Sequence, residues 1–210
     1  MELVITCLLC VGLTITINHF YKNGRQSLVF SAAASIVISL CFYLLFRSMP
    51  ILIYVCLTGF VFNLVLLSLE DMKNLSVTDW QIAVFGAIAL LLRIFLPIPI
   101  LATVISAAGG FLLFFVPYLV TRREGIGIGD VLVMTGVSLV TTPVETVLVF
   151  LFTAFSATIY GAIRYFVSGS RERIPLIPFI AGAAILVLGL RDFLIPLLGL
   201  RDLYNLQFLF

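Results

Sequence analysis

The chain has 210 residues, of which 62% are hydrophobic and only 10% are charged, with a mean hydropathy of +1.25 and a net charge of +2. A soluble globular domain carries about 25% charged residues, so this composition excludes one, and the small net charge predicts no nucleic-acid partner. A helix needs about 20 apolar residues to cross a bilayer. The chain therefore predicts an all-α membrane bundle with about eight transmembrane helices, forming one integral membrane domain over residues 1–210.

Eight apolar stretches are separated by short polar or proline-containing turns. They cover residues 3–18, 27–46, 51–69, 80–96, 100–120, 131–141, 146–163 and 174–190. The first stretch has neither a basic leader nor a small-residue cleavage site, so we expect a retained span rather than a signal peptide. The tail, residues 191–210, is interrupted by Pro196, Arg201 and Asp202, which predicts an interfacial or re-entrant segment.

Lysine and arginine are distributed unevenly between the alternate loops, and this predicts the orientation. One side holds Lys22, Arg25, Lys73, Arg122, Arg123, Arg164, Arg171 and Arg173. The other side holds Arg47, Arg191 and Arg201. By the positive-inside rule the first side is cytoplasmic and the N-terminus is outside. The polar loops at residues 70–79 and 124–130 are then both cytoplasmic.

A glycine-rich loop, Glu124-Gly125-Ile126-Gly127-Ile128-Gly129-Asp130, leads directly into an apolar stretch. It fits neither a dinucleotide-binding fingerprint nor a P-loop, because Asp130 follows Gly129 at once and no Gly-Lys-Ser/Thr follows. Glycine can adopt positive φ, so we expect a sharp turn that a peptide backbone can approach closely. The simpler alternative is that Asp130 is only the N-cap of the following helix.

A second acidic loop, at residues 70–79, shares the predicted face with Asp130 and contains Asp71 and Asp79. Two carboxyl groups held close together cannot both ionise easily, so one keeps a proton while the other acts as a base. An aspartic peptidase needs this pair, and it needs no metal or other cofactor. Asp79 precedes Trp80 and is expected to be an N-cap, although an exchange of roles with Asp71 stays open. Glu70 and Glu124 are expected to be solvated neighbours that make the local potential more negative.

Together these segments resemble the type IV prepilin peptidase family. Asp71 followed by Val77-Thr78-Asp79 looks like the first active-site motif of that family, and Gly127-Ile128-Gly129-Asp130 looks like the second, which names the GxGD membrane aspartyl proteases. The stretch from Arg173 to Phe179, with Pro175 and Pro178, is similar to the Ile-Pro-Phe-Gly-Pro-Phe opening of a late span. The likeness covers residues 66–190 approximately and includes Gly109-Gly110-Phe111.

The resemblance implies that Asp71 and Asp130 are the catalytic pair. Gly125, Gly127, Gly129, Asp79, Glu124, Pro175 and Pro178 would form the active-site loop and the substrate-binding positions. The enzyme would remove the short basic leader from prepilins or pseudopilins at the cytoplasmic face of a prokaryotic inner membrane. Its partners would be this membrane-anchored substrate helix and the lipid bilayer.

The chain also departs from the family pattern. Thr78 stands where the family usually has Pro, Leu132 where a Lys often follows the second Asp, and Ile177 where a Gly is usual. Larger members carry a cytoplasmic zinc domain linked to N-methylation, and this chain has no such insert, so methyltransferase activity is not predicted. Cys7 and Cys10 form a Cys-x-x-Cys without a second pair, so we expect buried thiols rather than a zinc site.

Two other classes of function stay open. A relative that keeps the fold but has altered activity could act as a pilus or secretion assembly factor, and Thr78 and Leu132 favour it. A small transporter whose acids relay protons would need an aqueous path to the outer face and internal repeats, and no convincing repeat is present. Glu145, on the predicted outer side, is expected to be an ordinary loop charge.

Overall fold

The computed structural model describes residues 50–121, 125–169 and 173–208, together with residues 5–7, 9–12, 15 and 43. The labelled helices are α3 (Ile51–Asn74), α4 (Asp79–Phe95), α5 (Ile100–Val120), α6 (Ile128–Val140), α7 (Pro143–Ser168), α8 (Ile177–Leu197) and α9 (Arg201–Leu206). Within these described ranges there is no strand, so the predicted all-α class is confirmed at that level. The predicted spans at residues 3–18 and 27–46 lie mostly outside the described residues.

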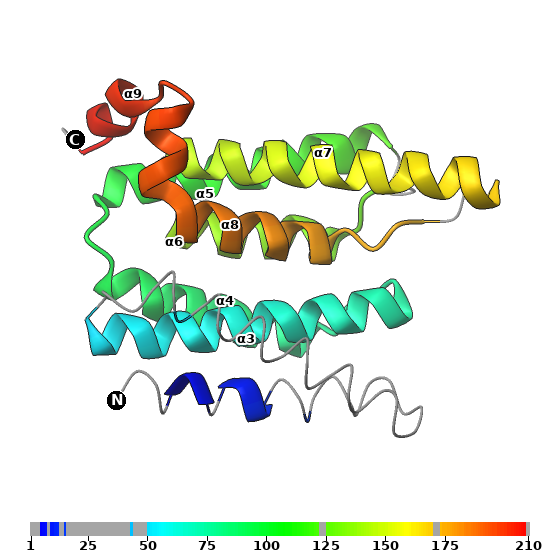
Figure 1. Ribbon diagram of the computed structural model, residues 1–210, viewed down its shortest axis with the longest axis horizontal. Helices are drawn as coiled ribbons and strands as arrows, with labels where there is room; N and C mark the ends of the chain where they lie inside the picture. Colours follow the sequence, from blue (N-terminus) through cyan, green and yellow to red (C-terminus); the bar gives the residue numbers. More distant parts are fainter. Residues whose placement is uncertain are drawn as a thin grey trace.

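Six of these helices form a closed ring of neighbouring pairs in the order α3, α4, α6, α5, α7, α8 and back to α3 (Figure 1). Helix α6 also contacts α7 and α8 across the ring. It is short, and seven of its side chains or glycines are buried, namely Val131, Val133, Met134, Gly136, Val137, Ser138 and Val140. The ring therefore holds α6 from several sides, and this fixes the position of the residues at its N-terminal end.

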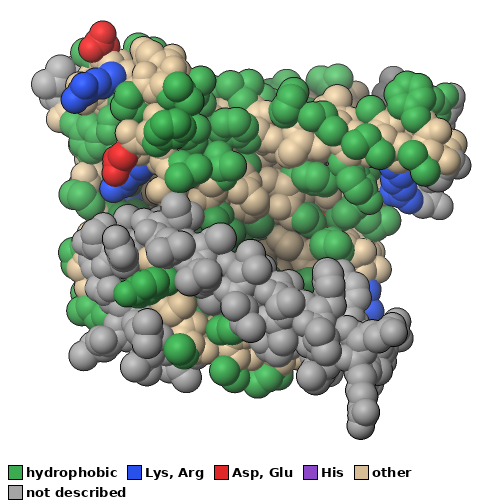
Figure 2. Space-filling model, in the orientation of Figure 1, with side chains coloured by type: hydrophobic (Ala, Val, Ile, Leu, Met, Phe, Trp, Pro, Cys, Tyr) green, Lys and Arg blue, Asp and Glu red, His purple; other side chains and the backbone are tan. Residues whose placement is uncertain are grey.

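Four helices, α3, α5, α7 and α8, are long and apolar enough to cross a membrane. Helix α6 has 13 residues and extends about 20 Å, which is less than the hydrocarbon thickness of about 30 Å. Hydrophobic side chains are spread over the described part of the visible face, and the charged side chains lie at its two ends (Figure 2). The chain is a multi-pass membrane protein, but the predicted number of eight spans is not confirmed.

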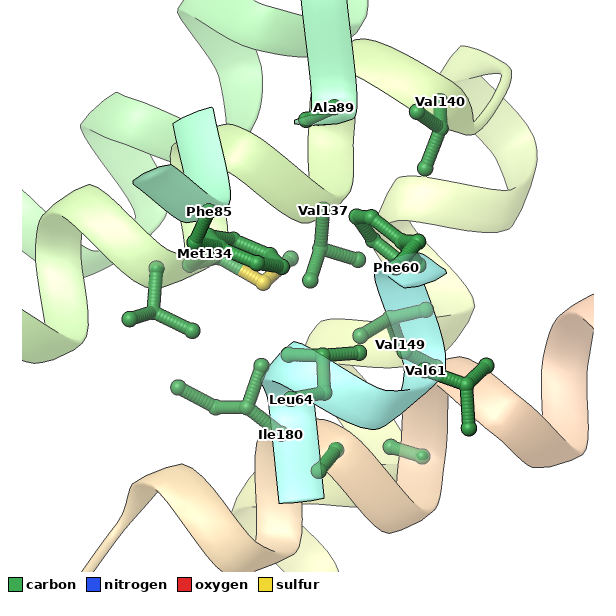
Figure 3. Close-up of a cluster of buried hydrophobic side chains, with 14 of the residues drawn as sticks. Phe60, Val61, Leu64, Phe85, Ala89, Met134, Val137, Val140, Val149 and Ile180 are labelled. Atoms are coloured by element: carbon green, nitrogen blue, oxygen red, sulfur yellow. The ribbon is translucent and has the colours of Figure 1, made fainter. Parts of the chain in front are cut away.

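A cluster of buried side chains joins α3, α4 and α6 (Figure 3). The rings of Phe60 and Phe85 lie 5.0 Å apart between centroids, and Met134 and Val137 pack beside them. Gly136 makes this approach possible, because a Cβ there would lie 2.5 Å from Cε1 of Phe85. The absence of a side chain at Gly136 thus lets α4 and α6 come together.

Two expectations about charged and cysteine residues are wrong. Glu145 is buried, with 1% of its surface exposed, because its carboxylate accepts the Thr142 N–H at 2.8 Å in a capping box at the start of α7. The Tyr204 hydroxyl of α9 donates to the same carboxylate at 3.5 Å, so the tail packs back on the bundle. Cys7 is exposed and Cys10 is only half-buried, so the expectation of buried thiols is wrong.

Candidate active site

Asp71 lies in the last turn of α3, not in a polar loop as the sequence predicted, since the helix continues to Asn74. Leu75 ends the helix with φ of 51°, and its N–H donates to the Asp71 carbonyl oxygen at 2.9 Å. A non-glycine residue in this left-handed conformation is uncommon. Asp71 is only 6% exposed.

The Asp71 carboxylate caps a different helix, α8. Its Oδ2 accepts the backbone N–H of Ile177, the first residue of α8, at 3.1 Å. The α8 N-cap is Leu176, which has no side-chain acceptor of its own. Helix N-termini carry unpaired N–H groups and a positive partial charge. This contact therefore fixes the orientation of the carboxylate.

Asp130 lies in the first turn of α6, outside the four long apolar helices. The N-cap is Gly127, so the alternative that Asp130 is the N-cap is wrong. Asp130 is instead the third helical residue, and its Oδ2 accepts the Gly127 N–H at 2.9 Å. Oδ1 of Asp130 accepts no hydrogen bond from the described part of the chain. One carboxyl oxygen is thus fixed and the other is available.

The glycines of the loop contribute room rather than unusual dihedral angles. Gly125, Gly127 and Gly129 do not have positive φ, so the loop bends without the left-handed conformation that glycine allows. A Cβ at Gly125 would lie 3.0 Å from Cγ2 of Thr121, and one at Gly127 would lie 3.4 Å from Oδ2 of Asp130. A Cβ at Gly129 would make only an ordinary contact, at 3.7 Å from Ile82. Side chains at the first two positions would therefore crowd the loop or the carboxylate.

Asp71 and Asp130 line the same cavity, although 59 positions separate them in the sequence. This cavity has a volume of about 210 Å³, and Asp79, Gly127 and Gly129 also line it. A second cavity of about 50 Å³ is lined by both aspartates and by Gly125 and Arg173. The structure therefore brings together the two carboxyl groups that the sequence analysis singled out.

The pKa of Asp130 is raised to about 7, chiefly because burial removes water from the carboxyl group. The hydrogen bond from Gly127 lowers this pKa, and the negative charge of Asp71 raises it. Asp130 thus keeps a proton up to about neutral pH.

The remaining predicted site residues lie at the edges of the site. Asp79 is exposed and is the first residue of α4, whose N-cap is Thr78, so the N-cap expectation for Asp79 is wrong. Pro175 and Pro178 are half-buried and line neither cavity. Glu124 lies outside the described residues.

The structure also bears on two neighbouring residues from the sequence analysis, Glu70 and Thr78. Glu70 is buried, with 7% exposed, and its Oε2 has no hydrogen-bond partner among the described residues, so it is not a solvated neighbour. Thr78 has φ of −75°, which proline can also adopt. The backbone at this position is therefore compatible with the proline that the family usually has.

Sequence reasoning missed the backbone N–H of Ile177, because a main-chain donor leaves no mark in a side-chain pattern. Pro178 could have located it, since proline favours the first turn of a helix. Arg173 was counted among the loop charges and was not predicted as a site residue, yet it lines the smaller cavity with both aspartates. Its place just before the Ile-Pro stretch was the available signal.

Comparison with protein-family models gives one match, to the type IV leader peptidase family, over residues 58–162. This range is half of the chain and contains both Asp71 and Asp130. The chain belongs to the type IV leader peptidase family. The comparisons with curated proteins and with solved structures give no match. Membership of this family supports a peptidase with a function like that of type IV leader peptidases.

Proposed function

We propose that this member of the type IV leader peptidase family is a membrane aspartic endopeptidase. Its substrates would be type IV prepilins or pseudopilins, whose short basic leader it removes at the cytoplasmic face of a prokaryotic inner membrane. The observation that supports this most strongly is the placement of Asp71 and Asp130 in one cavity, at the ends of two helices.

The different surroundings of the two carboxyl groups suggest their roles. Asp71, whose Oδ2 accepts the Ile177 N–H, is the base that takes a proton from water as the water oxygen attacks the scissile carbonyl carbon. Asp130 holds the second proton at neutral pH and donates a hydrogen bond to the carbonyl oxygen. When the C–N bond breaks, a proton passes to the leaving amine. The products are a free leader carboxylate and a new N-terminus.

The purified protein, reconstituted in liposomes with a full-length prepilin, tests this function directly. We expect mass spectrometry to show one cut, between the basic leader and the apolar helix, with no cut inside either part. A correctly folded protein that leaves prepilins intact, or that cuts them at many positions, would rule out a leader peptidase.

The pKa of Asp130 predicts how leader removal depends on pH. A carboxyl group with a pKa of about 7 is protonated below this pH and loses the proton above it, so we expect the cleavage rate to fall as pH rises through about 7. Leu132 lines the same cavity and is 42% exposed. A cation there would favour ionised Asp130, so Leu132→Lys is expected to move the fall to lower pH.

The control for this prediction is Leu132→Met, which keeps the side chain uncharged and similar in size. It should show the pH profile of the unmodified protein. Identical profiles for Leu132→Lys and Leu132→Met would show that titration of Asp130 does not limit the reaction.

A further inference from the structure

A groove of about 510 Å³ runs along α7 beside α5. Helices α5 and α7 lie side by side in the upper part of Figure 1. Most of the α7 residues that line the groove have small side chains or are glycine, namely Thr153, Ala154, Ala157, Thr158, Gly161 and Ala162. Phe150 of α7 and Phe114 of α5 also line it. This apolar groove differs in character from the acidic cavities.

The small residues of α7 follow helical spacing. Thr153, Ala157 and Gly161 are four positions apart and form one row along the helix. Rows of small residues allow two helix backbones to approach closely within a membrane. At Gly161 the space is already limited, because a Cβ would lie 2.8 Å from Cδ1 of Ile174. The groove thus has the surface of a helix that packs against a partner helix.

The groove adjoins the aspartate pair. It shares Gly125, Ile126, Arg173, Ile174 and Leu176 with the cavity of about 50 Å³ that Asp71 and Asp130 line. A peptide that passes the two carboxyl groups therefore meets the Gly125–Ile126 segment and then the small-residue wall of α7. The two sites form one continuous surface.

We propose that this groove binds the apolar transmembrane helix of the substrate, directly beyond the peptide bond held at Asp71 and Asp130. The inference rests on the proposed function, since it assigns the helix that follows the leader to a defined face of the protein. The groove and the cavity of both aspartates share five lining residues, so a helix that directly follows a peptide held at the aspartates enters the groove.

Photochemical cross-linking tests the groove independently of cleavage. A photoreactive phenylalanine analogue replaces Ala154 in the Asp130→Asn protein, which is reconstituted with an intact prepilin. The matched control carries the analogue at Ala108, which is exposed on α5 and does not line the groove. We expect cross-links from position 154 to the apolar segment of the prepilin, with a yield at least about tenfold above that from position 108. Equal yields, or adducts to lipid only, would overturn the proposal.

Kinetics provide the second measurement. Ala157→Leu fills the groove, so we expect it to raise KM for full-length prepilin about tenfold with little change in kcat, while Ala108→Leu leaves both unchanged. An unchanged KM in Ala157→Leu would count against the groove. If the unmodified protein cleaves no prepilin but the cross-link at position 154 forms, the proposed function fails and the groove stands. If prepilin is cleaved but that cross-link does not form, the proposed function stands and the groove fails.

Discussion

Replacement of either aspartate by asparagine is expected to lower the rate of leader removal by about 10³-fold or more. Asparagine keeps the size of the side chain but can neither accept the proton of the attacking water as a carboxylate does nor supply an acidic proton. Asp71→Asn removes the proposed base, and Asp130→Asn removes the group whose pKa is about 7. The measurement is the conversion of a co-expressed prepilin to its shorter form on a gel, at matched protein levels.

Asp79→Asn is the matched control, because Asp79 lines the same cavity but is exposed at the first position of α4. We expect it to retain a rate within about tenfold of the unmodified protein. Loss of activity in Asp79→Asn with retention in Asp71→Asn would reverse the assignment of the base. Processing at a normal rate by Asp130→Asn would eliminate the aspartic mechanism.

Gly110→Ala is expected to destabilise the folded protein by about 1–3 kcal/mol, because it overpacks the contact between α5 and α6. A Cβ at Gly110 would lie 2.7 Å from Cβ of Ser138. Ser138 is fully buried, and its hydroxyl donates to the Met134 carbonyl oxygen at 2.8 Å. Its side chain therefore has no free space, and a Cβ at Gly110 would push α5 and α6 apart. Thermal unfolding of the purified protein in detergent measures the effect as a lower Tm.

Gly109→Ala is the control for this change, since a Cβ at Gly109 would have nothing within 4 Å among the described atoms. It is expected to leave Tm unchanged or slightly raised, because alanine favours a helix more than glycine does. Equal losses of Tm in the two variants would show that flexibility of the Gly109-Gly110 pair, rather than the close approach of α6, determines stability.

The fold was predictable wherever hydropathy and helix boundaries coincide. The stretch predicted at residues 100–120 is helix α5 with the same bounds, because prolines precede it and a polar segment follows. The stretch predicted at residues 51–69 is too short, because Glu70, Met72 and Lys73 favour a helix although they are polar or sit among polar residues. Hydropathy shows where a segment stops being apolar, but it does not show where the helix ends.

The sequence predicted the two acidic residues of the candidate site but not the contacts that surround them. The sequence identified Asp71 and Asp130 through their place at the ends of apolar stretches and through a family resemblance, and the structure puts both in one cavity. It could not show that the carboxylate of Asp71 caps α8, since that depends on the packing of α3 against α8. The burial of Glu70 and Glu145 was missed for the same reason.

The proposed mechanism depends on the two carboxyl groups acting as one unit on the same peptide bond. The most direct measurement compares prepilin cleavage by four purified proteins in identical liposomes: unmodified, Asp71→Asn, Asp130→Asn and the double variant. Residues that act as a unit have non-additive effects, so the double variant should be no slower than either single variant. The shared mechanism would be contradicted if the fold-loss of the double variant equalled the product of the two single fold-losses. It would also be contradicted if either single variant cleaved at the rate of the unmodified protein.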